Sequence, residues 1–349
     1  MWRGAQLVQQ GQWIIQLGEP ELAALRQAVA LMQASGVAIE QIGLDVVRNP
    51  VLEATARTWL TELNLGRGFI FARGLDRLGY GDDDIARAYW ALGLHIGTAV
   101  PQSKDGELLG HVRDIGAADD PKIRLYKTRK KQDFHVDGSD IVGLLCLKGA
   151  RSGGLSRIVS SMTVYKHIVA TRPDLVSALF EPMYWDIAAD APPGHPPFIQ
   201  MPICTTVNGS LRFFYIGWYI RNAQQYAQVP RLTPAQAQLL DLIEAAANNP
   251  VNYLDMDFKP GDMQFLKNSV ILHSRTEYDD DDEPALKRHL LRLWLTAHLF
   301  DDGDPLVRRG FSRARRTDWP GQFNMSHELI LRKRVHILSK RGGNYRLAP

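Results

Sequence analysis

The stretch KKQDFHVDG, Lys130–Gly138, places two metal-binding side chains near the middle of the chain. His135 and Asp137 are two residues apart, and side chains with that spacing point to the same face of an extended strand. An imidazole nitrogen and a carboxylate oxygen can therefore reach one metal ion. With 10 histidines in 349 residues, a His-x-Asp step also arises by chance, so a partly exposed strand with ordinary polar side chains is the alternative.

A further histidine lies in a strand-like segment far downstream. Lys259–Arg275 opens with a Pro-Gly-Asp turn and continues as a largely apolar run that reaches His273. Two histidines and one carboxylate on one side of an ion, with its other positions open, make up the facial triad of non-haem Fe(II) sites. The sequence therefore predicts His135, Asp137 and His273 as metal ligands.

Two arginines follow this histidine at a spacing that suits a strand. Arg288 and Arg292 lie four residues apart in the largely apolar segment Lys287–Leu295, so one strand face carries both, roughly 13 Å apart. Guanidinium groups bind carboxylates in bidentate pairs. An unpartnered arginine in a largely buried strand is costly, which favours a functional role over two ordinary surface arginines.

The order of these residues resembles the taurine dioxygenase (TauD/TfdA) family of Fe(II)/2-oxoglutarate oxygenases, in which His-x-Asp, a distant His and Arg-x-x-x-Arg follow one another. Ser152–Ser156 is similar to the Gly-Gly-x-Thr/Ser segment of that family, and Phe69–Gly74 is similar to its early strand. The similarity extends from about residue 65 to about residue 300. It implies a double-stranded β-helix (jelly roll) core, a fold that is mainly β with flanking helices.

The resemblance also implies cofactors and individual roles. Fe(II) would bind 2-oxoglutarate as cosubstrate, and O2, at its open positions. Arg288, helped by Ser156, would hold the distal carboxylate of 2-oxoglutarate, which leaves Arg292 for an acidic group of the primary substrate. Related halogenases carry a small residue in place of the ligand carboxylate, so Asp137 favours oxygenation.

The expected reaction couples decarboxylation of 2-oxoglutarate to oxidation of an unactivated C–H bond. Hydroxylation is the default outcome, and desaturation or ring closure would use the same ligands. Arg292 indicates a small-molecule substrate with a carboxylate or sulfonate, and an amino acid or a derivative is the first expectation. Weaker candidates for substrate contact are Lys131, Asn268 and Tyr126, each of which also has an ordinary structural interpretation.

Two other classes of function fit parts of the sequence. A Zn-dependent hydrolase or isomerase would use the same triad, and a requirement for 2-oxoglutarate separates it from an oxygenase. A non-catalytic binding protein would instead hold an acidic partner through the basic clusters Arg308–Arg316 and Arg332–Arg334. Intact activity after deletion of the residues beyond 305 would count against that second alternative.

Length and composition are those of a globular protein. The chain is 45% hydrophobic and 23% charged, and its net charge of +3 gives no reason to expect a nucleic-acid partner. Cys146 and Cys204 are too few for a disulfide framework, which fits a reducing cytoplasm. No signal-peptide layout and no apolar run of membrane-spanning length occurs. A cytoplasmic location without membrane contact is therefore expected, and self-association is left open.

Three regions are expected along the chain: a helical N-terminal scaffold (1–64), the jelly-roll domain (65–304) and a basic C-terminal extension (305–349). Local patterns predict several of their elements. The expected helices are Pro20–Ala34, Val51–Leu65, Asp82–Gly93 and Pro234–Ala247, the last with Thr233 as its N-cap. The expected strands include Ile123–Lys127, Ile141–Leu147 and the hairpin Pro202–Val207 with Ser210–Tyr219.

Overall fold

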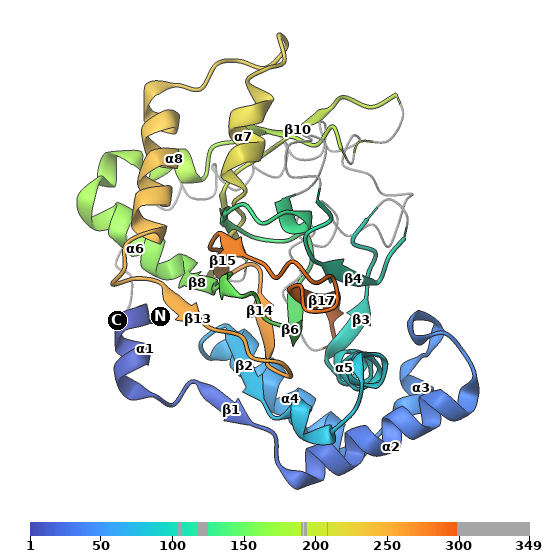
Figure 1. Ribbon diagram of the computed structural model, residues 1–349. Helices are drawn as coiled ribbons and strands as arrows, with labels where there is room; N and C mark the ends of the chain where they lie inside the picture. Colours follow the sequence, from blue (N-terminus) through green and yellow to red (C-terminus); the bar gives the residue numbers. More distant parts are fainter. Residues whose placement is uncertain (104–105, 117–124, 190, 192–193, 208, 299–349) are drawn as a thin grey trace.

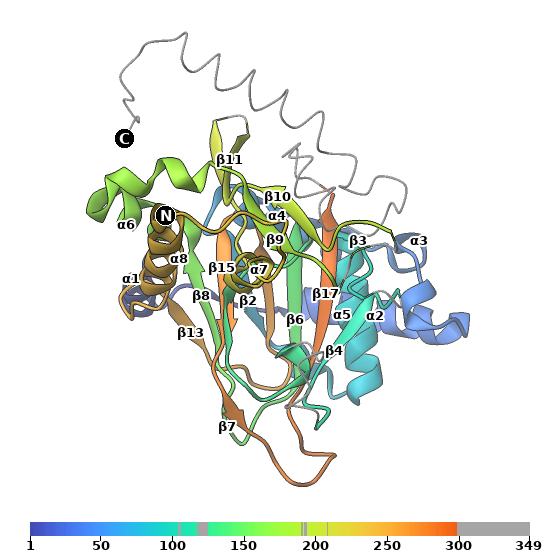
Figure 2. The same cartoon turned by 90° about the horizontal axis from the view of Figure 1, so that it is seen from above.

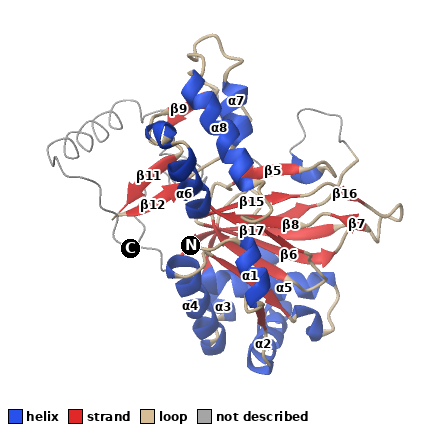
Figure 3. Ribbon diagram, turned by 90° about the vertical axis from the view of Figure 1, so that its left-hand side faces the viewer, coloured by secondary structure: helices blue, strands red, loops and turns tan. Residues whose placement is uncertain are grey.

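Two β-sheets lie face to face at the centre of the molecule, and helices cover the outer face of each sheet (Figures 1 and 3). The computed structural model describes residues 1–103, 106–116, 125–189, 191, 194–207 and 209–298. The predicted basic extension, 305–349, lies outside the described residues. Within the described ranges, no helix combines the length and the apolar character needed to span a bilayer.

The larger sheet is antiparallel except at one edge, where β1 and β2 run parallel. Because β1 belongs to this sheet, residues 1–64 contribute a strand as well as helices. In spatial order the strands are β1 (Ile14–Gln16), β2 (Phe69–Arg73), β14 (Met263–Lys267), β6 (Ile141–Lys148), β17 (His289–Ala297) and β3 (Gly97–Ala99), with β4 (Leu109–Val112) also paired to β17.

The smaller sheet carries the predicted metal-binding histidines. Its strands are β13 (Leu254–Met256), β8 (Ser156–Ser160), β15 (Ile271–Arg275) and β5 (Gln132–His135), all antiparallel. Three two-stranded pairs complete the strands: β7 (Ser152–Gly153) with β16 (Tyr278–Asp279), β9 (Met183–Asp186) with β10 (Phe198–Met201), and β11 (Cys204–Val207) with β12 (Ser210–Phe213).

Alternation along the strands sorts side chains between the two faces of each sheet. On β17, Leu291, Leu293 and Leu295 join the core beneath the helices, whereas Leu290 and Trp294 join the core between the sheets. Arg292 lies between Leu290 and Trp294 in this alternation and is buried as they are. The space between the sheets is therefore where the polar site is enclosed.

Two groups of helices cover the sheets, and Figure 2 shows the strands between them. The larger sheet packs against α2, α4 and α5, and the smaller sheet packs against α6 and α8. The α-helices are α1 (Gly4–Gln10), α2 (Glu19–Ser35), α3 (Leu44–Val47), α4 (Pro50–Leu65), α5 (Asp82–Ile96), α6 (Ser161–Thr171), α7 (Gly217–Ala223) and α8 (Pro234–Ala247). The 3-10 helices are η1 (Ile39–Gln41), η2 (Leu75–Leu78), η3 (Leu125–Lys127), η4 (Pro173–Leu175) and η5 (Ser177–Leu179).

Elements with a clear period and clear end signals match their predictions. Helix α8 has the predicted bounds, and the Thr233 side chain accepts a hydrogen bond from the Gln236 backbone N–H at 3.2 Å. Strand β2 lies within the segment Phe69–Gly74 that resembles the family's early strand, and β6 runs one residue further than expected.

Two predicted strands are wrong over part of their length. The described part of Ile123–Lys127 forms η3, whose chain folds back so that the Thr128 backbone N–H donates to the Leu125 carbonyl oxygen at 3.0 Å. The second hairpin strand ends at Phe213, and α7 begins at Gly217. Phe213–Ile216 is buried at every position, and an apolar run without alternation does not distinguish a strand from the approach to a helix.

Candidate metal centre

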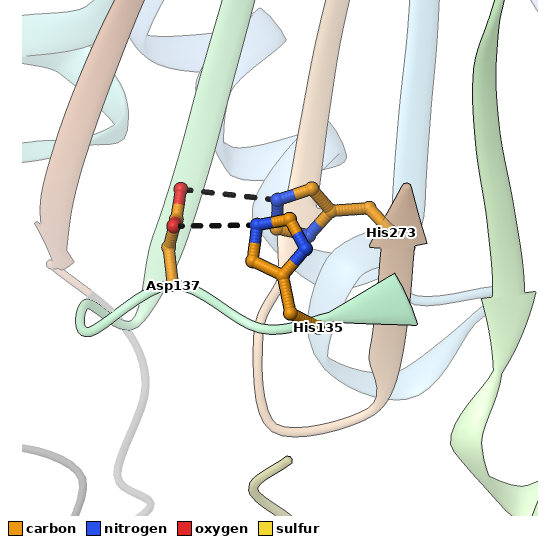
Figure 4. Close-up of side chains that lie close together, drawn as sticks. All are labelled: His135, Asp137 and His273. Atoms are coloured by element: carbon orange, nitrogen blue, oxygen red, sulfur yellow. Dashed lines mark ion pairs between the residues drawn. The ribbon is translucent and has the colours of Figure 1, made fainter. Parts of the chain in front are cut away.

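The register between two strands brings together histidines that are far apart in the sequence. His135 is the last residue of β5, and it pairs directly with His273 in the middle of β15. Their imidazole centroids lie 4.2 Å apart. Figure 4 shows both rings turned toward the carboxylate of Asp137.

Asp137 reaches the site from a loop rather than from the strand that was expected to carry it. Strand β5 ends at His135, and the next backbone N–H, that of Val136, donates to the Tyr215 carbonyl oxygen at 3.0 Å. The Asp137 backbone N–H donates to Oδ1 of Asn268 at 3.0 Å. The expectation of a shared strand face is therefore wrong in detail, because tertiary hydrogen bonds redirect the chain immediately after His135.

The three side chains are close enough to bind one ion. Nε2 of His135 lies 3.9 Å from Oδ1 of Asp137, and Nε2 of His273 lies 3.8 Å from Oδ2. One ligand atom from each residue lies within 4.8 Å of the other two, and all three residues are buried. Two imidazoles and one carboxylate form the donor set that suits non-haem Fe(II).

Hydrogen bonds orient His135 for metal binding. Its Nδ1 lies 2.8 Å from the Asp133 carbonyl oxygen, which can only accept, so Nδ1 carries the proton. Nε2 then presents its lone pair, and the Gln132 side-chain nitrogen lies 3.0 Å from it. A backbone carbonyl on the far nitrogen is the usual way in which proteins fix the tautomer and orientation of a metal-binding histidine.

The protonation states of the three side chains also suit a metal. Burial lowers the pKa of His135, and it lowers the pKa of His273 to about 3, with the neighbouring His135 adding to the effect. Burial alone would raise the pKa of Asp137. The charge of Arg292, helped by interactions with the two histidines and by the Trp294 hydrogen bond, outweighs this effect and leaves the Asp137 pKa below its usual range. Neutral imidazoles and an ionised carboxylate are the forms that coordinate metals.

Trp294 and Arg292 fix the carboxylate ligand from the opposite sheet. The indole Nε1 of Trp294 donates to Oδ2 of Asp137 at 2.9 Å, and Nη1 of Arg292 lies 3.6 Å from the same oxygen. Both residues belong to β17, two positions apart on its inner face. The larger sheet therefore orients a ligand whose partners come from the smaller sheet.

A cavity adjoins the triad between the two sheets. Besides the triad, it is lined by Val112, Tyr126, Gln132, Val142, Leu144, Ser156, Ser274, Arg275, Arg288, Leu290 and Arg292. Three lining residues are arginines, whereas Asp137 is the one acidic residue of the lining. The enclosed space thus combines an apolar wall with an excess of cationic groups.

Arg288 and Arg292, predicted to lie on one strand face, both line this cavity. Arg288 immediately precedes β17. The Arg292 guanidinium lies 4.5 Å from the centroid of the Tyr126 ring, and its Nε donates to Oε1 of Gln102 at 2.7 Å. Ser156 lines the cavity as well, and its hydroxyl donates to Oε1 of Gln264 at 3.2 Å.

The weaker candidates lie in three different settings. Tyr126 is buried and lines the cavity beneath Arg292. Lys131 is exposed, forms an ion pair of 2.9 Å with Asp133, and does not line the cavity. Asn268 is buried and also lies outside the lining, where it supports the Asp137 loop. Substrate contact by these residues stays a prediction.

Three residues of the site were not anticipated. Arg275 and Trp294 each lie two positions beyond a predicted residue, His273 and Arg292, so strand alternation carried a signal for both. Gln102 follows β3 and reaches Arg292 only through the folded arrangement, since its Nε2 also donates to the Arg292 carbonyl oxygen at 2.7 Å. The residues next to Gln102 in the sequence do not indicate its contact with Arg292.

Comparison with known proteins identifies the family. The model of the family described as "Taurine catabolism dioxygenase TauD, TfdA family" matches residues 28–294. FR-33289 synthase of Streptomyces rubellomurinus is 30% identical over 302 residues, which are 84% of this chain and 88% of that protein. The taurine hydroxylase-like protein SAT17 of Stachybotrys chartarum is 28% identical over 301 residues, covering 84% of this chain and 77% of that protein.

Solved structures with the same fold include two oxygenases. An asparagine oxygenase in complex with Fe(II), (2S,3S)-3-hydroxyasparagine and succinate aligns with a TM-score of 0.65 at 15% identity, covering 82% of this chain and 94% of that one. The non-haem iron oxygenase OrfP in complex with Fe and α-ketoglutaric acid aligns with a TM-score of 0.57 at 15% identity, covering 81% and 94%. These alignments confirm the predicted jelly-roll fold with flanking helices.

The family model spans most of the residues that form the two sheets, and the buried His-Asp-His set is the site that Fe(II) chemistry of this kind requires. The chain belongs to the TauD/TfdA family and is an Fe(II)/2-oxoglutarate-dependent dioxygenase.

Proposed function

We propose that this enzyme hydroxylates a C–H bond of a small anionic metabolite, with amino acids and their derivatives as the first class to test. One observation carries the proposal: the guanidinium of Arg292 lines the cavity only 3.6 Å from the ligand oxygen Oδ2 of Asp137. An acidic group bound by Arg292 would hold the rest of a small molecule beside the metal. The complexes of asparagine oxygenase with 3-hydroxyasparagine and of OrfP with (3S)-hydroxy-L-Arg support an amino acid as substrate.

The charge balance of the cavity supports an anionic substrate. Its lining carries Arg275, Arg288 and Arg292 against the single carboxylate of Asp137. Fe(II) and the dianion of 2-oxoglutarate have equal and opposite charges, so loading both leaves the excess of positive charge in place. A low-dielectric cavity strengthens the attraction for an anion that offsets that excess.

Each residue at the site has a distinct proposed task. His135, Asp137 and His273 would hold Fe(II), which with 2-oxoglutarate and O2 supplies the oxidant for the C–H bond. Trp294 keeps Oδ2 of Asp137 in place by its hydrogen bond of 2.9 Å. The mainly apolar wall of the cavity, including Leu290, keeps bulk water from the reacting carbon.

Two further residues would position the cosubstrate. Arg288, which immediately precedes β17, and Ser156 of β8 both line the cavity, and we propose that both contact the distal carboxylate of 2-oxoglutarate. A guanidinium binds a carboxylate through two parallel hydrogen bonds, which fixes the orientation of the diacid as well as its affinity. Arg292, which lies closer to Asp137, would remain available to the primary substrate.

An anaerobic binding screen followed by an oxygen pulse tests the proposal. The full chain is loaded with Fe(II) and 2-oxoglutarate, and the metal-to-ligand charge-transfer band is recorded as α-amino acids, taurine and uncharged analogues are added one at a time. We expect the band to shift with one class of anionic compound and not with its uncharged amide or ester. After admission of O2, that compound should gain one oxygen atom while succinate forms in equal amount.

The product distinguishes hydroxylation from its alternatives. A product that has lost two hydrogens and gained no oxygen would replace hydroxylation by desaturation or ring closure.

A further inference from the structure

Arg275 places a third guanidinium in the wall of the cavity. It lies two residues beyond His273 on β15, hence on the same face of the strand and roughly 7 Å further along it, and it is buried. Its Nη2 donates to the Thr128 carbonyl oxygen at 2.8 Å and to the Lys130 carbonyl oxygen. Its Nε and Nη1 are buried and have no hydrogen-bond partner in the described part of the chain.

Arg288 presents a similar unused donor next to it. Nη1 of Arg288 is buried and also lacks a hydrogen-bond partner among the described residues. Both guanidiniums lie 5.0 Å from the centroid of the Tyr278 ring. Two buried cations with unused donors are costly unless an anion comes to bind between them.

No protein carboxylate fills that role in the described residues. Neither arginine forms an ion pair there. Asp280 accepts from the Arg288 backbone N–H at 2.7 Å through Oδ1, and its Oδ2 is buried without a hydrogen-bond partner among the described residues. Both arginines line the cavity, and no carboxylate of the described residues forms an ion pair with either of them.

The Gly-Gly-x-Ser segment, Gly153–Ser156, lies next to the same two arginines. Ser156 is the direct cross-strand partner of Arg275 in the pairing of β8 with β15. Gly154 has a positive φ of 68°, and a Cβ at this position would lie 3.1 Å from Nε of Arg288. One residue of the segment thus adjoins Arg275, and another makes room for Arg288.

We infer that Arg275 and Arg288 together form the receptor for the distal carboxylate of 2-oxoglutarate. The inference rests on the proposed function, in which Arg288 binds the distal carboxylate of 2-oxoglutarate. It adds a positioning residue on the strand that also carries the metal ligand His273. Because Nη2 of Arg275 holds the carbonyl oxygens of Thr128 and Lys130, the same side chain ties the carboxylate site to the segment that leads into β5 and His135.

A simple structural role for Arg275 makes a different prediction. A side chain that only braces Thr128 and Lys130 needs Nη2 alone, and its loss would disturb the binding of every keto acid at the metal. If Arg275 instead binds the distal carboxylate, its loss weakens the binding of only those keto acids that carry this second carboxylate. The two roles are therefore separated by comparing 2-oxoglutarate with 2-oxopentanoate, which keeps the chelating keto acid and replaces the distal carboxylate by a methyl group.

The experiment uses the full chain with Fe(II) under anaerobic conditions, and the charge-transfer band reports binding of each keto acid. The variants are Arg275→Lys and Arg275→Met, with Arg157→Lys as the matched control. Arg157 lies on the adjacent strand β8 and pairs with Asp255 at 2.6 Å, away from the cavity lining. Circular dichroism checks that each variant is folded.

We expect both Arg275 variants to raise the Kd for 2-oxoglutarate by about tenfold or more, the loss that follows from removing one charge-assisted contact. The Kd for 2-oxopentanoate should change by less than about twofold, and Arg157→Lys should change neither value. An unchanged Kd for 2-oxoglutarate, or an equal loss for both keto acids, would overturn the inference. A wild-type chain that gives no band with either keto acid would overturn the proposed function itself.

Discussion

His135 and His273 face each other across the antiparallel strands β5 and β15, with ring centroids 4.2 Å apart, although they are 138 positions apart in the sequence. The candidate metal centre is therefore assembled only when the smaller sheet has formed. Asp137 completes it from the loop after β5, and the larger sheet supplies the hydrogen bond that orients its carboxylate. Substitutions in either sheet are expected to change metal binding in specific ways.

Replacing Trp294 by Phe should weaken Fe(II) binding while the fold is retained. The change removes the hydrogen bond of 2.9 Å to Oδ2 of Asp137 and keeps most of the aromatic surface. Loss of such a partner of a metal ligand typically costs 10–100-fold in affinity or activity, and we expect about tenfold in the Kd for Fe(II).

Trp185→Phe is the control for this prediction. Trp185 is also buried, and its Nε1 donates a hydrogen bond of 2.8 Å to the Met201 carbonyl oxygen, outside the lining of the cavity. It should lose stability without losing Fe(II) affinity. Equal Fe(II) affinities for Trp294→Phe and wild type, measured by anaerobic titration, would show that Trp294 does not orient the ligand.

Arg292→Lys should affect the primary substrate and leave the cosubstrate largely unaffected. Lysine keeps the charge but loses the fork that binds an acid through two hydrogen bonds and the contact with Oε1 of Gln102 at 2.7 Å. We expect the KM for the substrate to rise by about tenfold or more. The Kd for 2-oxoglutarate should stay within about twofold, and a larger increase for 2-oxoglutarate than for substrate would reverse the proposed roles of Arg288 and Arg292.

Asn268→Ala should reduce both stability and Fe(II) affinity. Oδ1 of Asn268 accepts the Asp137 backbone N–H at 3.0 Å, and its Nδ2 donates to the Ser139 carbonyl oxygen at 2.9 Å. Truncation leaves buried backbone groups without partners, which costs about 1–3 kcal/mol in the free energy of unfolding. The Asp137 loop also loses its main anchor.

Asn252→Ala separates these two effects. Asn252 is buried and donates to the Ala246 carbonyl oxygen at 2.9 Å, with no contact to the triad. Urea unfolding and anaerobic Fe(II) titration are measured for both variants. Both should be destabilised, but only Asn268→Ala should bind Fe(II) more weakly, and parallel losses of affinity would argue against a specific role for Asn268.

The stability of the fold should decrease as the pH falls below about 6.5, partly because of a histidine pair outside the metal centre. Nδ1 of His111 lies 2.8 Å from Nε2 of His289, and a hydrogen bond between the two rings requires that one of these two nitrogens carry no proton. Partial burial and the neighbouring His111 lower the pKa of His289 to about 4. Between these pH values the His289 imidazole is protonated in the unfolded chain and neutral in the folded chain, so acid favours unfolding.

His289→Gln should therefore reduce the pH dependence of the stability of the fold. The difference between the urea midpoints at pH 7.5 and pH 5 is compared among wild type, His289→Gln and the exposed-site control His195→Gln. We expect a smaller difference for His289→Gln and no change for His195→Gln. A difference that is the same in all three proteins would show that the pair does not contribute to acid sensitivity.

The sequence was sufficient for the triad because its evidence is local chemistry in a fixed order. His135 and Asp137 are two residues apart, and His273 ends an apolar run of the length of a strand. Helix α8 and strand β2 were predictable for a similar reason, since their boundaries carry a cap, a turn or a proline. These features do not depend on how the two sheets meet.

Contacts that depend on the packing of the two sheets were not predictable in the same way. Gln102 reaches Arg292 from the end of β3, and the course of η3 reflects carbonyl groups that turn toward Arg275. Nothing within a few residues of Gln102 or η3 encodes those partners. The break in β5 after His135 has the same origin, because the hydrogen bonds that redirect the loop come from Tyr215 and Asn268.

A crystal structure of the Fe(II)-loaded chain, prepared without oxygen and recorded at the iron absorption edge, tests the central claim most directly. We predict a single strong anomalous peak within about 2.0–2.2 Å of Nε2 of His135, Nε2 of His273 and a carboxylate oxygen of Asp137. Iron bound elsewhere, or bound at His135 and Asp137 while the His273 ring points away, would contradict the account.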